Sequence, residues 1–273
     1  MKDFWKYFLD KSDVSKEILE FGYSKERKFK DYFEKFCSEM GFDERINTAQ
    51  NISIDFYEKQ PKTLVKNGKY VLRTGFGKFM VFDEFKFDKP YLNLNFKEVT
   101  ELEYAIPEGF DHLYDCYKKD NTENSKIEQL QCFGIFEKIA NTVSNEEKCL
   151  IGPRGNKVSE FDTYLYDTDG KIKHVFKYTG QEELDYSIFT KDSIYLFEAK
   201  SVKNGLDLGW HKIAFPSNRF LNYGKRIIPG YILNQKNNLL IYIFKGIESY
   251  KNGIILNDKT QLEPKYAFKI KKV

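Results

Sequence analysis

The feature that most constrains the fold is an unbroken apolar run, Ile194-Tyr195-Leu196-Phe197, which leads directly into Glu198-Ala199-Lys200. Side chains of a strand alternate between the two faces of a sheet, so a run without a polar interruption predicts a strand covered on both faces. Such a strand belongs inside a sheet that has further layers on either side. A chain of 273 residues, 41% hydrophobic and 17% aromatic, is large enough to bury that sheet.

The segments around this run predict a helix, then strands, then a second helix and more strands. A helix is expected over residues 126–141, and Asp169-Gly170 is a strong signal for a two-residue hairpin turn. EELDYSIF and SIYLFEAK are expected to pair across a tight turn at Thr190–Ser193. After a helical segment at about 206–223, RIIPGYIL and NLLIYIF provide further strands, separated by QKNN. This order predicts an α/β fold whose mixed β-sheet is flanked by helices.

Residues 1–120 predict a separate N-terminal α+β region, because the polar, turn-rich stretch 111–126 is typical of a domain boundary. Helices are expected at 13–21, ending at Gly22, and at 24–40, capped by Ser24. The two form either a helix-turn-helix or an ordinary packed pair. A hairpin is expected over 69–82. Residues 121–273 then form the second domain.

Charge is distributed unevenly along the chain. From Lys200 to the end there are 14 Lys/Arg against 4 Asp/Glu, a balance of +10, within a net charge of +3. A basic segment of this kind suits a polyanion, although a lysine-rich solvated surface has the same composition. No apolar run approaches the length of a membrane span, and the N-terminus is too acidic for a secretory signal. We therefore expect a cytoplasmic protein that does not enter membranes.

An acidic residue two positions before a lysine occurs six times, so this spacing by itself identifies nothing. The copies begin at Glu26, Glu84, Glu146, Asp169, Glu198 and Glu263. Glu198 differs from the others because an apolar strand leads into it and an acidic strand precedes that strand. A carboxylate and a lysine at the end of a buried strand are costly unless they pair or bind a metal.

The hairpin register brings a second carboxylate to Glu198. If Lys191-Asp192 is the turn, residues whose numbers sum to 383 face each other, which sets Asp185 opposite Glu198 and Glu183 opposite Lys200. Two carboxylates with Cβ atoms roughly 5 Å apart share either a proton or a cation. Oxygen ligands of this kind suit Mg²⁺, and Lys200 would orient the attacking water, accept its proton or neutralise the phosphate. A structural ion-pair ladder across the hairpin is the alternative.

These residues resemble the signature of the PD-(D/E)XK nuclease superfamily. Gln181-Glu182-Glu183-Leu184-Asp185 followed by IYLFEAK is similar to a Gln-x-Glu-x-Asp…Glu-Ala-Lys pattern found in a group of type II restriction endonucleases. Ile151-Gly152-Pro153-Arg154-Gly155-Asn156 resembles the Arg-Gly-Arg-like element that precedes it there, with Asn156 in place of the second arginine. Lys212-Ile213-Ala214-Phe215-Pro216 resembles the segment that follows, with Lys212 where glutamine is commoner.

The resemblance implies a restriction-endonuclease-like core in which Asp185 and Glu198 bind Mg²⁺, with Mn²⁺ as a substitute, and Lys200 is the catalytic lysine. Some members add a glutamate from the preceding helix, for which Glu128 is the first candidate and Glu137 the second. Glu183 is expected to assist. DNA contacts are predicted for Arg154, Lys212 and Arg219, with a loop salt bridge as the alternative for Arg154. His211 is expected to pack or to lie at the surface.

The function implied is that of a type II restriction endonuclease, which hydrolyses both strands of double-stranded DNA at a short specific sequence. Symmetric cleavage of two antiparallel strands implies a homodimer, to which the N-terminal region would contribute DNA recognition or dimerisation. Two alternatives stay open. One is a structure-selective repair nuclease or junction resolvase of the same fold, and the other is a non-catalytic DNA-binding protein on that scaffold.

Overall fold

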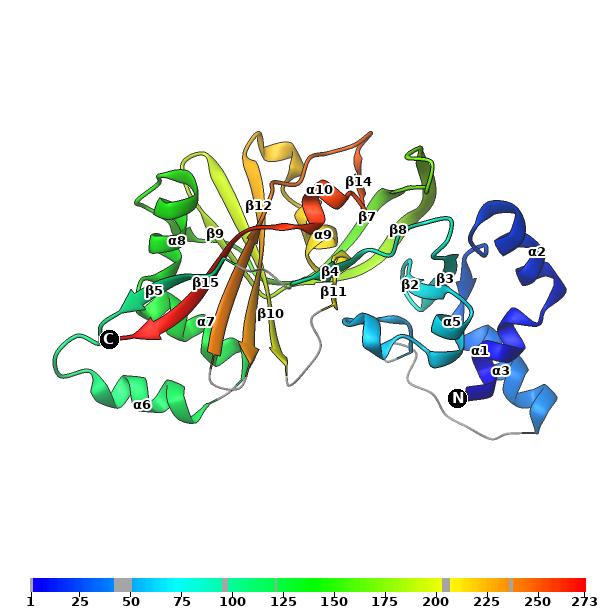
Figure 1. Cartoon of the computed structure of the whole chain (residues 1–273), viewed down its shortest axis with the longest axis horizontal. Helices are drawn as coiled ribbons and strands as arrows, with labels where there is room; N and C mark the ends of the chain where they lie inside the picture. Colours follow the sequence, from blue (N-terminus) through cyan, green and yellow to red (C-terminus); the bar gives the residue numbers. More distant parts are fainter. Residues whose placement is uncertain (1, 42–50, 95–97, 121, 203–206, 236–237) are drawn as a thin grey trace.

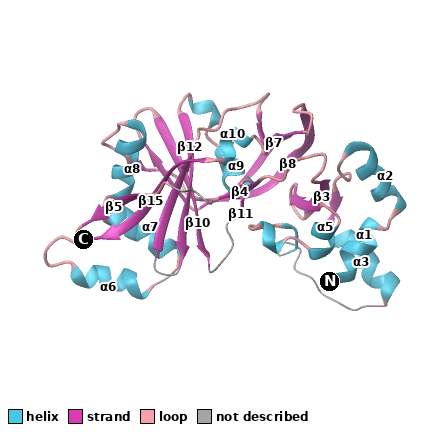
Figure 2. Cartoon of the chain, in the orientation of Figure 1, coloured by secondary structure: helices cyan, strands magenta, loops and turns pink. Residues whose placement is uncertain are grey.

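The computed structural model describes residues 2–41, 51–94, 98–120, 122–202, 207–235 and 238–273. It is a mixed α/β protein with a large curled mixed sheet and an N-terminal lobe of helices and short strands (Figure 1). Figure 2 shows most of the strands in the sheet and in one long hairpin, with the short β3 among the helices of the N-terminal lobe. The predicted coarse fold, a mixed sheet flanked by helices with an N-terminal α+β region, is therefore confirmed.

The large sheet has seven strands within the described residues, in the order β5-β15-β13-β12-β10-β9-β6. Neighbours are antiparallel except for two parallel pairs, β10 with β12 and β15 with β5. The strands are β5 (Thr100–Tyr104), β6 (Leu150–Ile151), β9 (Tyr186–Phe189), β10 (Ser193–Val202), β12 (Arg226–Gln235), β13 (Asn238–Phe244) and β15 (Pro264–Lys272).

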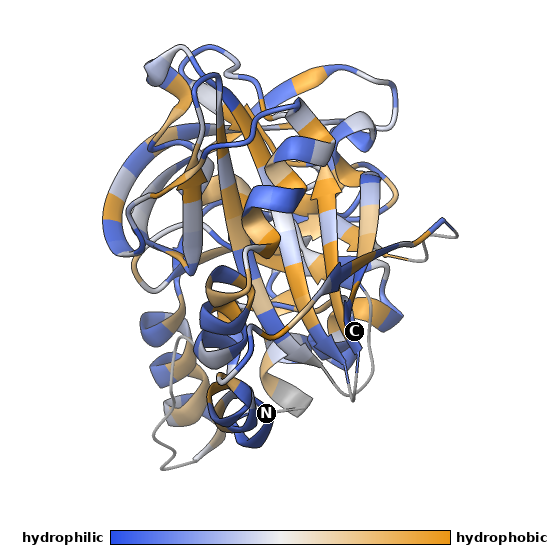
Figure 3. Ribbon diagram, turned by 90° about the vertical axis from the view of Figure 1, so that its left-hand side faces the viewer, coloured by the Kyte–Doolittle hydropathy of each residue, from blue (hydrophilic) through white to orange (hydrophobic). Residues whose placement is uncertain are grey.

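Strand β10 is covered on both faces, as its apolar run predicts. Tyr195 and Phe197 pack in a core cluster with helices α7 (Glu123–Cys132) and α8 (Ile135–Ser144). Ile194 and Leu196 point to the other face, into a cluster that contains helix α9 (His211–Ser217). Figure 3 shows the hydrophobic residues concentrated along these central strands. Glu198 and Lys200 have the same parity as Leu196, so they lie on the α9 face.

A long antiparallel hairpin, β7 (Gly155–Tyr166) and β8 (Ile172–Leu184), extends from the sheet toward the N-terminal lobe (Figure 1). It turns at Asp169-Gly170, where Gly170 adopts φ 76°, as the sequence predicts. Strand β14 (Gly253–Ile255) pairs in parallel with β7. On the inner side of the hairpin, Phe161 and Tyr178 pack against Phe215 of α9. The hairpin is thereby fixed against the helix that borders the site.

The N-terminal lobe has an aromatic core of its own that includes Phe4, Phe8, Phe29, Phe33 and Phe79. Its elements are α1 (Lys2–Leu9), α2 (Ser12–Phe21), β1 (Arg27–Lys28), α3 (Phe29–Met40), η1 (Tyr57–Lys59), α5 (Lys62–Lys66), β2 (Lys69–Arg73) and β3 (Lys78–Asp83). Helix α2 ends at a left-handed Gly22 and β2 pairs with β3, both as predicted.

The helix predicted over 24–40 begins later, at Phe29. Ser24 does not cap it, because its hydroxyl accepts a hydrogen bond from Val81 N at 3.0 Å while its own N–H donates to Val81 O at 2.8 Å. Residues 27–28 are consequently strand β1, which pairs with β3. Tertiary pairing with β3 outweighs the local helical pattern over this short segment.

The lobe is joined to the rest of the protein by strand pairs. Strand β4 (Tyr91–Asn93) pairs with β11 (Asp207–Gly209), and Phe56 forms a bridge with Leu208. Strand β5 belongs to the large sheet although it precedes residue 120. Residues on both sides of the predicted boundary at 120 therefore share one sheet. Residue 121 itself lies outside the described residues.

Three predicted segments have different bounds in the structure. The helix expected over 126–141 is two helices, α7 and α8, separated by Phe133 and a left-handed Gly134. The helical segment at 206–223 is β11, α9 and η2 (Leu221–Tyr223). The polar stretch 111–126 contains helix α6 (Asp111–Lys119). A further short helix, α10 (Lys259–Leu262), precedes β15.

Residue 206, where the predicted helical segment 206–223 begins, lies outside the described residues. Residues 236–237, within the predicted QKNN turn, lie outside them as well. Within the described chain, no helix has both the length and the apolar character needed to cross a bilayer.

Candidate active site

The hairpin register predicted from the sequence is the one that β9 and β10 adopt. Ile194 pairs with Phe189 and Phe197 pairs with Tyr186, and the ladder stops there. Asp185 is the single residue between the end of β8 and the start of β9. Its Oδ2 accepts a hydrogen bond from Ala199 N at 2.8 Å, which holds the carboxylate beside Glu198. The two carboxylates are thus brought together by the backbone of β10.

Glu198 is a buried carboxylate with two cationic neighbours. Glu198 is 2% exposed, and Lys200 Nζ lies 2.9 Å from its Oε1. Burial raises the pKa of Glu198 to about 7, because Lys212 and Lys200 only partly offset the cost of desolvation and Asp185 adds repulsion. At neutral pH the group therefore stands midway between its acid and its carboxylate, which favours a further cation beside it.

Lys200 remains a cation at its position on β10. Burial alone would lower the pKa of its ammonium, but the negative charges of Glu198 and Asp55 outweigh burial and raise the pKa above its ordinary value. A lysine with a raised pKa is a poor proton acceptor near neutral pH. Of the three predicted roles for Lys200, charge neutralisation and the orientation of a water fit this environment, and proton acceptance does not.

Two further residues complete the charged cluster, which we define as Asp55, Asp185, Glu198, Lys200 and Lys212. Lys212 Nζ of α9 lies 3.7 Å from Glu198 Oε1 and 3.6 Å from Asp55 Oδ1. Asp55 Oδ2 lies 3.9 Å from Lys200 Nζ. Burial alone would raise the pKa of Asp55, but Lys212 and Lys200 overcome burial and lower the pKa. Lys212 therefore belongs to the cluster itself, and Asp55 is a site residue that the sequence interpretation missed.

Asp55 reaches the cluster from the N-terminal lobe. Its carbonyl accepts a hydrogen bond from Gly209 N at 2.7 Å, and its neighbours Ile54 and Phe56 are buried. These contacts fix the backbone so that the side chain faces β10 and α9. No local motif marks Asp55, since its role follows only from the pairing of this segment with residues 207–209.

The three glutamates predicted to assist catalysis are not part of the charged cluster. Glu183 does not oppose Lys200, because the β9–β10 ladder ends at Tyr186 and Phe197. Glu183 lies on β8, where it pairs with Asn156 of β7. Glu128 is exposed on α7, where its charge acts on Tyr117. Glu137 of α8 lies on the opposite face of the sheet, where its negative charge helps to raise the pKa of Cys149 and the pKa of Tyr186.

The glutamate of α7 that does approach β10 is Glu123. Its Oε1 accepts a hydrogen bond from Ser201 N at 2.8 Å, and its charge contributes to the raised pKa of Lys200. Glu123 is the first residue of the helix, at the end that lies next to β10. The expectation of a glutamate from the preceding helix therefore fits Glu123 better than Glu128.

The two predicted arginine contacts differ sharply. The Arg219 side chain is 7% exposed and forms a forked pair with Glu182, with Nε to Oε1 at 2.6 Å and Nη2 to Oε2 at 2.5 Å. This buried pair engages Arg219 within the protein, which favours structural support over the predicted DNA contact. Arg154 is exposed on the loop before β7, which Ser187 Oγ fixes by donating to Pro153 O at 2.7 Å.

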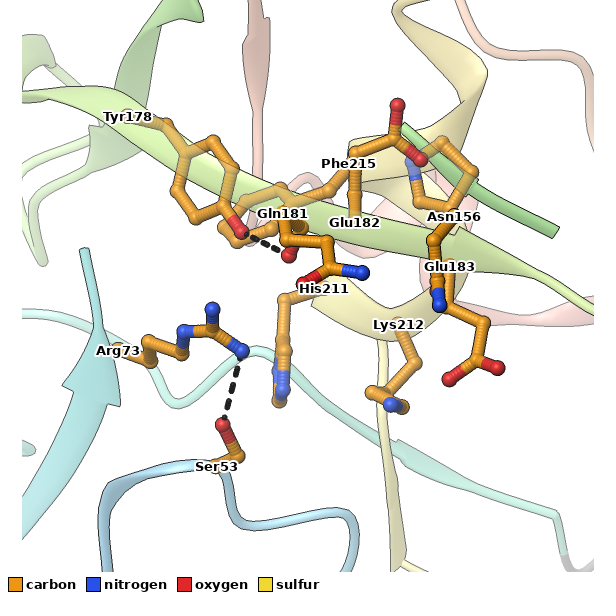
Figure 4. Close-up of a pocket in the computed structure, with 11 residues that line it drawn as sticks. Ser53, Arg73, Asn156, Tyr178, Gln181, Glu182, Glu183, His211, Lys212 and Phe215 are labelled. Carbon is orange, nitrogen blue, oxygen red and sulfur yellow. Dashed lines mark hydrogen bonds between the residues drawn. The ribbon is translucent and has the colours of Figure 1, made fainter. Parts of the chain in front are cut away.

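A cavity of about 280 Å³ opens beside the cluster, between the N-terminal lobe and the β7–β8 hairpin. Figure 4 shows Arg73 and Ser53 of the lobe on one side, Tyr178 and Gln181 of β8 on the other, and Lys212 at the border. His211 also lines the cavity. Its side chain is buried, in agreement with the expected packing role, and burial lowers its pKa to about 4. Lys212 is thus accessible from the cavity as well as from the cluster.

Comparison with known proteins assigns no family. No protein-family model matches the chain, and no curated protein is significantly similar to it. A solved structure described as a crystal structure of SSO0001 aligns with 58% of this chain and 73% of its own, at 12% identity and a TM-score of 0.23. A similarity at that level carries no argument about fold or function.

Proposed function

We propose that this protein is a metal-dependent DNA endonuclease of the PD-(D/E)XK type, with Asp185 and Glu198 as metal ligands and Lys200 as the catalytic lysine. The observation that carries the proposal is the convergence of these residues at the end of one buried strand. Asp185 is hydrogen-bonded to Ala199 N, and Lys200 Nζ lies 2.9 Å from Glu198. A restriction-endonuclease-like core is the finer description of the fold that we infer from this convergence.

The donor set suits Mg²⁺. Within the described residues no group of three or more His, Cys, Asp or Glu side chains could hold a metal ion. Mg²⁺ does not require one, because it commonly binds through one or two carboxylates and completes its octahedron with waters and substrate phosphates. The pKa of about 7 at Glu198 indicates a carboxylate that lacks sufficient positive charge, which a divalent cation would supply.

The protein residues have distinct roles in this proposal. Asp185 and Glu198 would hold Mg²⁺, with Asp185 fixed by its hydrogen bond to the strand backbone. The bound ion would supply Lewis-acid chemistry to the scissile phosphodiester and to an attacking water. Lys200, held protonated by Glu198 and Asp55, stabilises the negative charge that develops on the phosphate. Lys212 adds a second positive charge from α9.

Double-stranded DNA is the proposed substrate, and a homodimer the proposed state. The basic segment from Lys200 onward favours a polyanion. Exposed Arg154, on a loop fixed to β9, is available for a phosphate contact. Cleavage of both strands at a symmetric sequence would require two active sites related by a twofold axis.

The test is an incubation of the protein with plasmid DNA of known sequence, with Mg²⁺, with Mn²⁺ and with EDTA, followed by sequencing of the fragment ends. Discrete fragments with common ends, dependent on the metal, are expected. Branched and damaged duplexes are incubated in parallel, and products from these alone would favour a repair nuclease or a resolvase. Intact DNA with both metals, together with retained DNA binding, would favour a non-catalytic binding protein.

A further inference from the structure

The two lysines of the charged cluster face one carboxylate in a manner that suits a different anion. Asp55 presents one oxygen to each ammonium, Oδ1 to Lys212 Nζ at 3.6 Å and Oδ2 to Lys200 Nζ at 3.9 Å. Both distances exceed the 2.7–2.9 Å that is typical of a charge-assisted hydrogen bond. Lys200 is by contrast tightly paired to Glu198, at 2.9 Å. Asp55 is therefore the loosely held partner of both lysines.

A phosphodiester carries two non-bridging oxygens that share one negative charge, so it can face two ammonium groups as this carboxylate does. We infer that Lys200 and Lys212 form an oxyanion subsite for a DNA phosphodiester, and that the Asp55 carboxylate occupies this subsite in the free protein. The inference rests on the proposed function, because it names the position of the substrate phosphate within that site.

The surroundings of Asp55 allow such an exchange. The Asp55 side chain is 31% exposed, whereas that of Glu198 is 3% exposed. The backbone of Asp55 is held by Gly209 N at 2.7 Å, and Tyr91 Oη donates to the preceding carbonyl at 3.2 Å. Only the side chain would have to rotate, while the N-terminal lobe stays in place.

Access to the subsite is available from the cavity next to it. Lys212 lines that cavity together with Arg73, which comes from the N-terminal lobe. The Arg73 guanidinium is oriented by Gly75 O at 3.0 Å and Ser53 Oγ at 3.3 Å. A DNA backbone that follows the cavity would reach Lys212 first and would then compete with Asp55 for its ammonium group.

The experiment measures binding without cleavage. A short fluorescein-labelled duplex is titrated in EDTA with the wild type, Asp55→Asn, the double variant Asp55→Asn/Lys212→Gln, and Asp88→Asn. Asp88 is the matched control, because it pairs with Lys259 at 2.9 Å on the surface and belongs to no part of the cluster. Asp55→Ser is included as a second variant, and thermal unfolding of each protein shows whether it folds.

Removal of the competing carboxylate is expected to tighten binding at least about tenfold in Asp55→Asn and Asp55→Ser. The slope of log affinity against log salt is expected to steepen by about 0.9, because one more phosphate is neutralised. Asp88→Asn should bind as the wild type does, and the added Lys212→Gln should abolish the gain. A folded Asp55 variant that binds no more tightly than Asp88→Asn, or more weakly, would overturn the inference. Plasmid cleavage with Mg²⁺ is scored separately, so the subsite and the proposed endonuclease can fail independently.

Discussion

Lys200 Nζ lies 2.9 Å from Glu198 Oε1, and the two residues stand two positions apart on the same face of one strand. The pair is buried beneath α9, where Lys212 supplies a second cation at 3.7 Å from the same oxygen. Glu198 thus keeps one positive neighbour when the other is removed. This redundancy allows the chemical role of Lys200 to be separated from the stability of the fold.

Lys200→Ala is expected to lose DNA cleavage by at least about a hundredfold while it still binds DNA, because one charge that stabilises the transition state is removed. Single-turnover cleavage with Mg²⁺ and duplex binding in EDTA measure the two effects. Lys259→Ala, at an exposed pair, is the control. Cleavage at the wild-type rate in Lys200→Ala would remove the catalytic role assigned to this lysine.

Glu198→Gln is expected to change how stability depends on pH. Burial raises the pKa of Glu198 from 4.5 to about 7, so the folded protein binds this proton more tightly than the unfolded chain does. The contribution to stability is complete below about pH 4.5 and is lost as pH rises through about 7. Relative to Glu198→Gln, the wild type should lose about 3 kcal/mol of unfolding free energy over this range. Urea denaturation in EDTA at pH 5 and pH 8 measures it; a constant difference between the two proteins would contradict the prediction.

Two substitutions at Asp185 should separate its metal role from its structural role. Asp185→Asn retains an oxygen that accepts from Ala199 N, so the protein should fold but lose the stabilisation that Mg²⁺ gives the wild type at pH 8. Asp185→Ala should in addition lose about 1–3 kcal/mol, because a buried N–H is left without its acceptor. Thermal unfolding with and without Mg²⁺ provides both readings. An equal response to Mg²⁺ in wild type and Asp185→Asn would exclude Asp185 as a ligand.

Arg219→Ala is expected to destabilise the protein by about 3–5 kcal/mol, because it leaves the Glu182 carboxylate buried without its partner. The double variant Arg219→Met/Glu182→Leu removes both charges and should be much closer to wild type. Chemical denaturation of the two variants tests the assignment. If Arg219→Ala unfolded as the wild type does but bound DNA less well, Arg219 would be a DNA contact and not a structural residue.

Arg154→Ala is expected to leave stability unchanged and to weaken DNA binding. The side chain is exposed, so little packing is lost. If Arg154 neutralises one phosphate, the slope of log affinity against log salt should fall by about 0.9. Duplex binding across a salt series measures this. An unchanged slope would leave Arg154 as a loop residue without a role in binding.

The register of β9 and β10 could be predicted because it follows from the two-residue alternation of side chains along a strand. Alternation along β9 and β10, together with the tight turn at Thr190–Ser193, leaves a single pairing that buries both apolar sets, and that pairing is observed. The same arithmetic fails further along the chain from the end of the ladder at Tyr186 and Phe197. The residues before Asp185 belong to β8, which pairs with β7 and so carries Glu183 away from Lys200. Such a departure depends on a partner strand and has no local signal.

Residues that reach the site from elsewhere in the chain were the hardest to predict. Asp55 comes close to Lys200 only because the segment around it bridges to β11. Glu123 and Glu128 lie on one helix, and the helical period does not reveal which end of the helix approaches β10. A motif locates side chains on its own strand, whereas these contacts depend on the packing of whole elements.

The position of β15 has a consequence for synthesis of the chain. Strand β15 lies between β13 and β5, so within the described residues β5, made from residues 100–104, pairs with residues 264–272 alone. Until those residues have left the ribosome, β5 cannot join the sheet, and the outer edge of β13 remains exposed. Completion of the sheet therefore pairs strands that are distant in sequence, and pairings of this kind form slowly. Removal of residues 264–272 would leave two open edges, which are templates for aggregation.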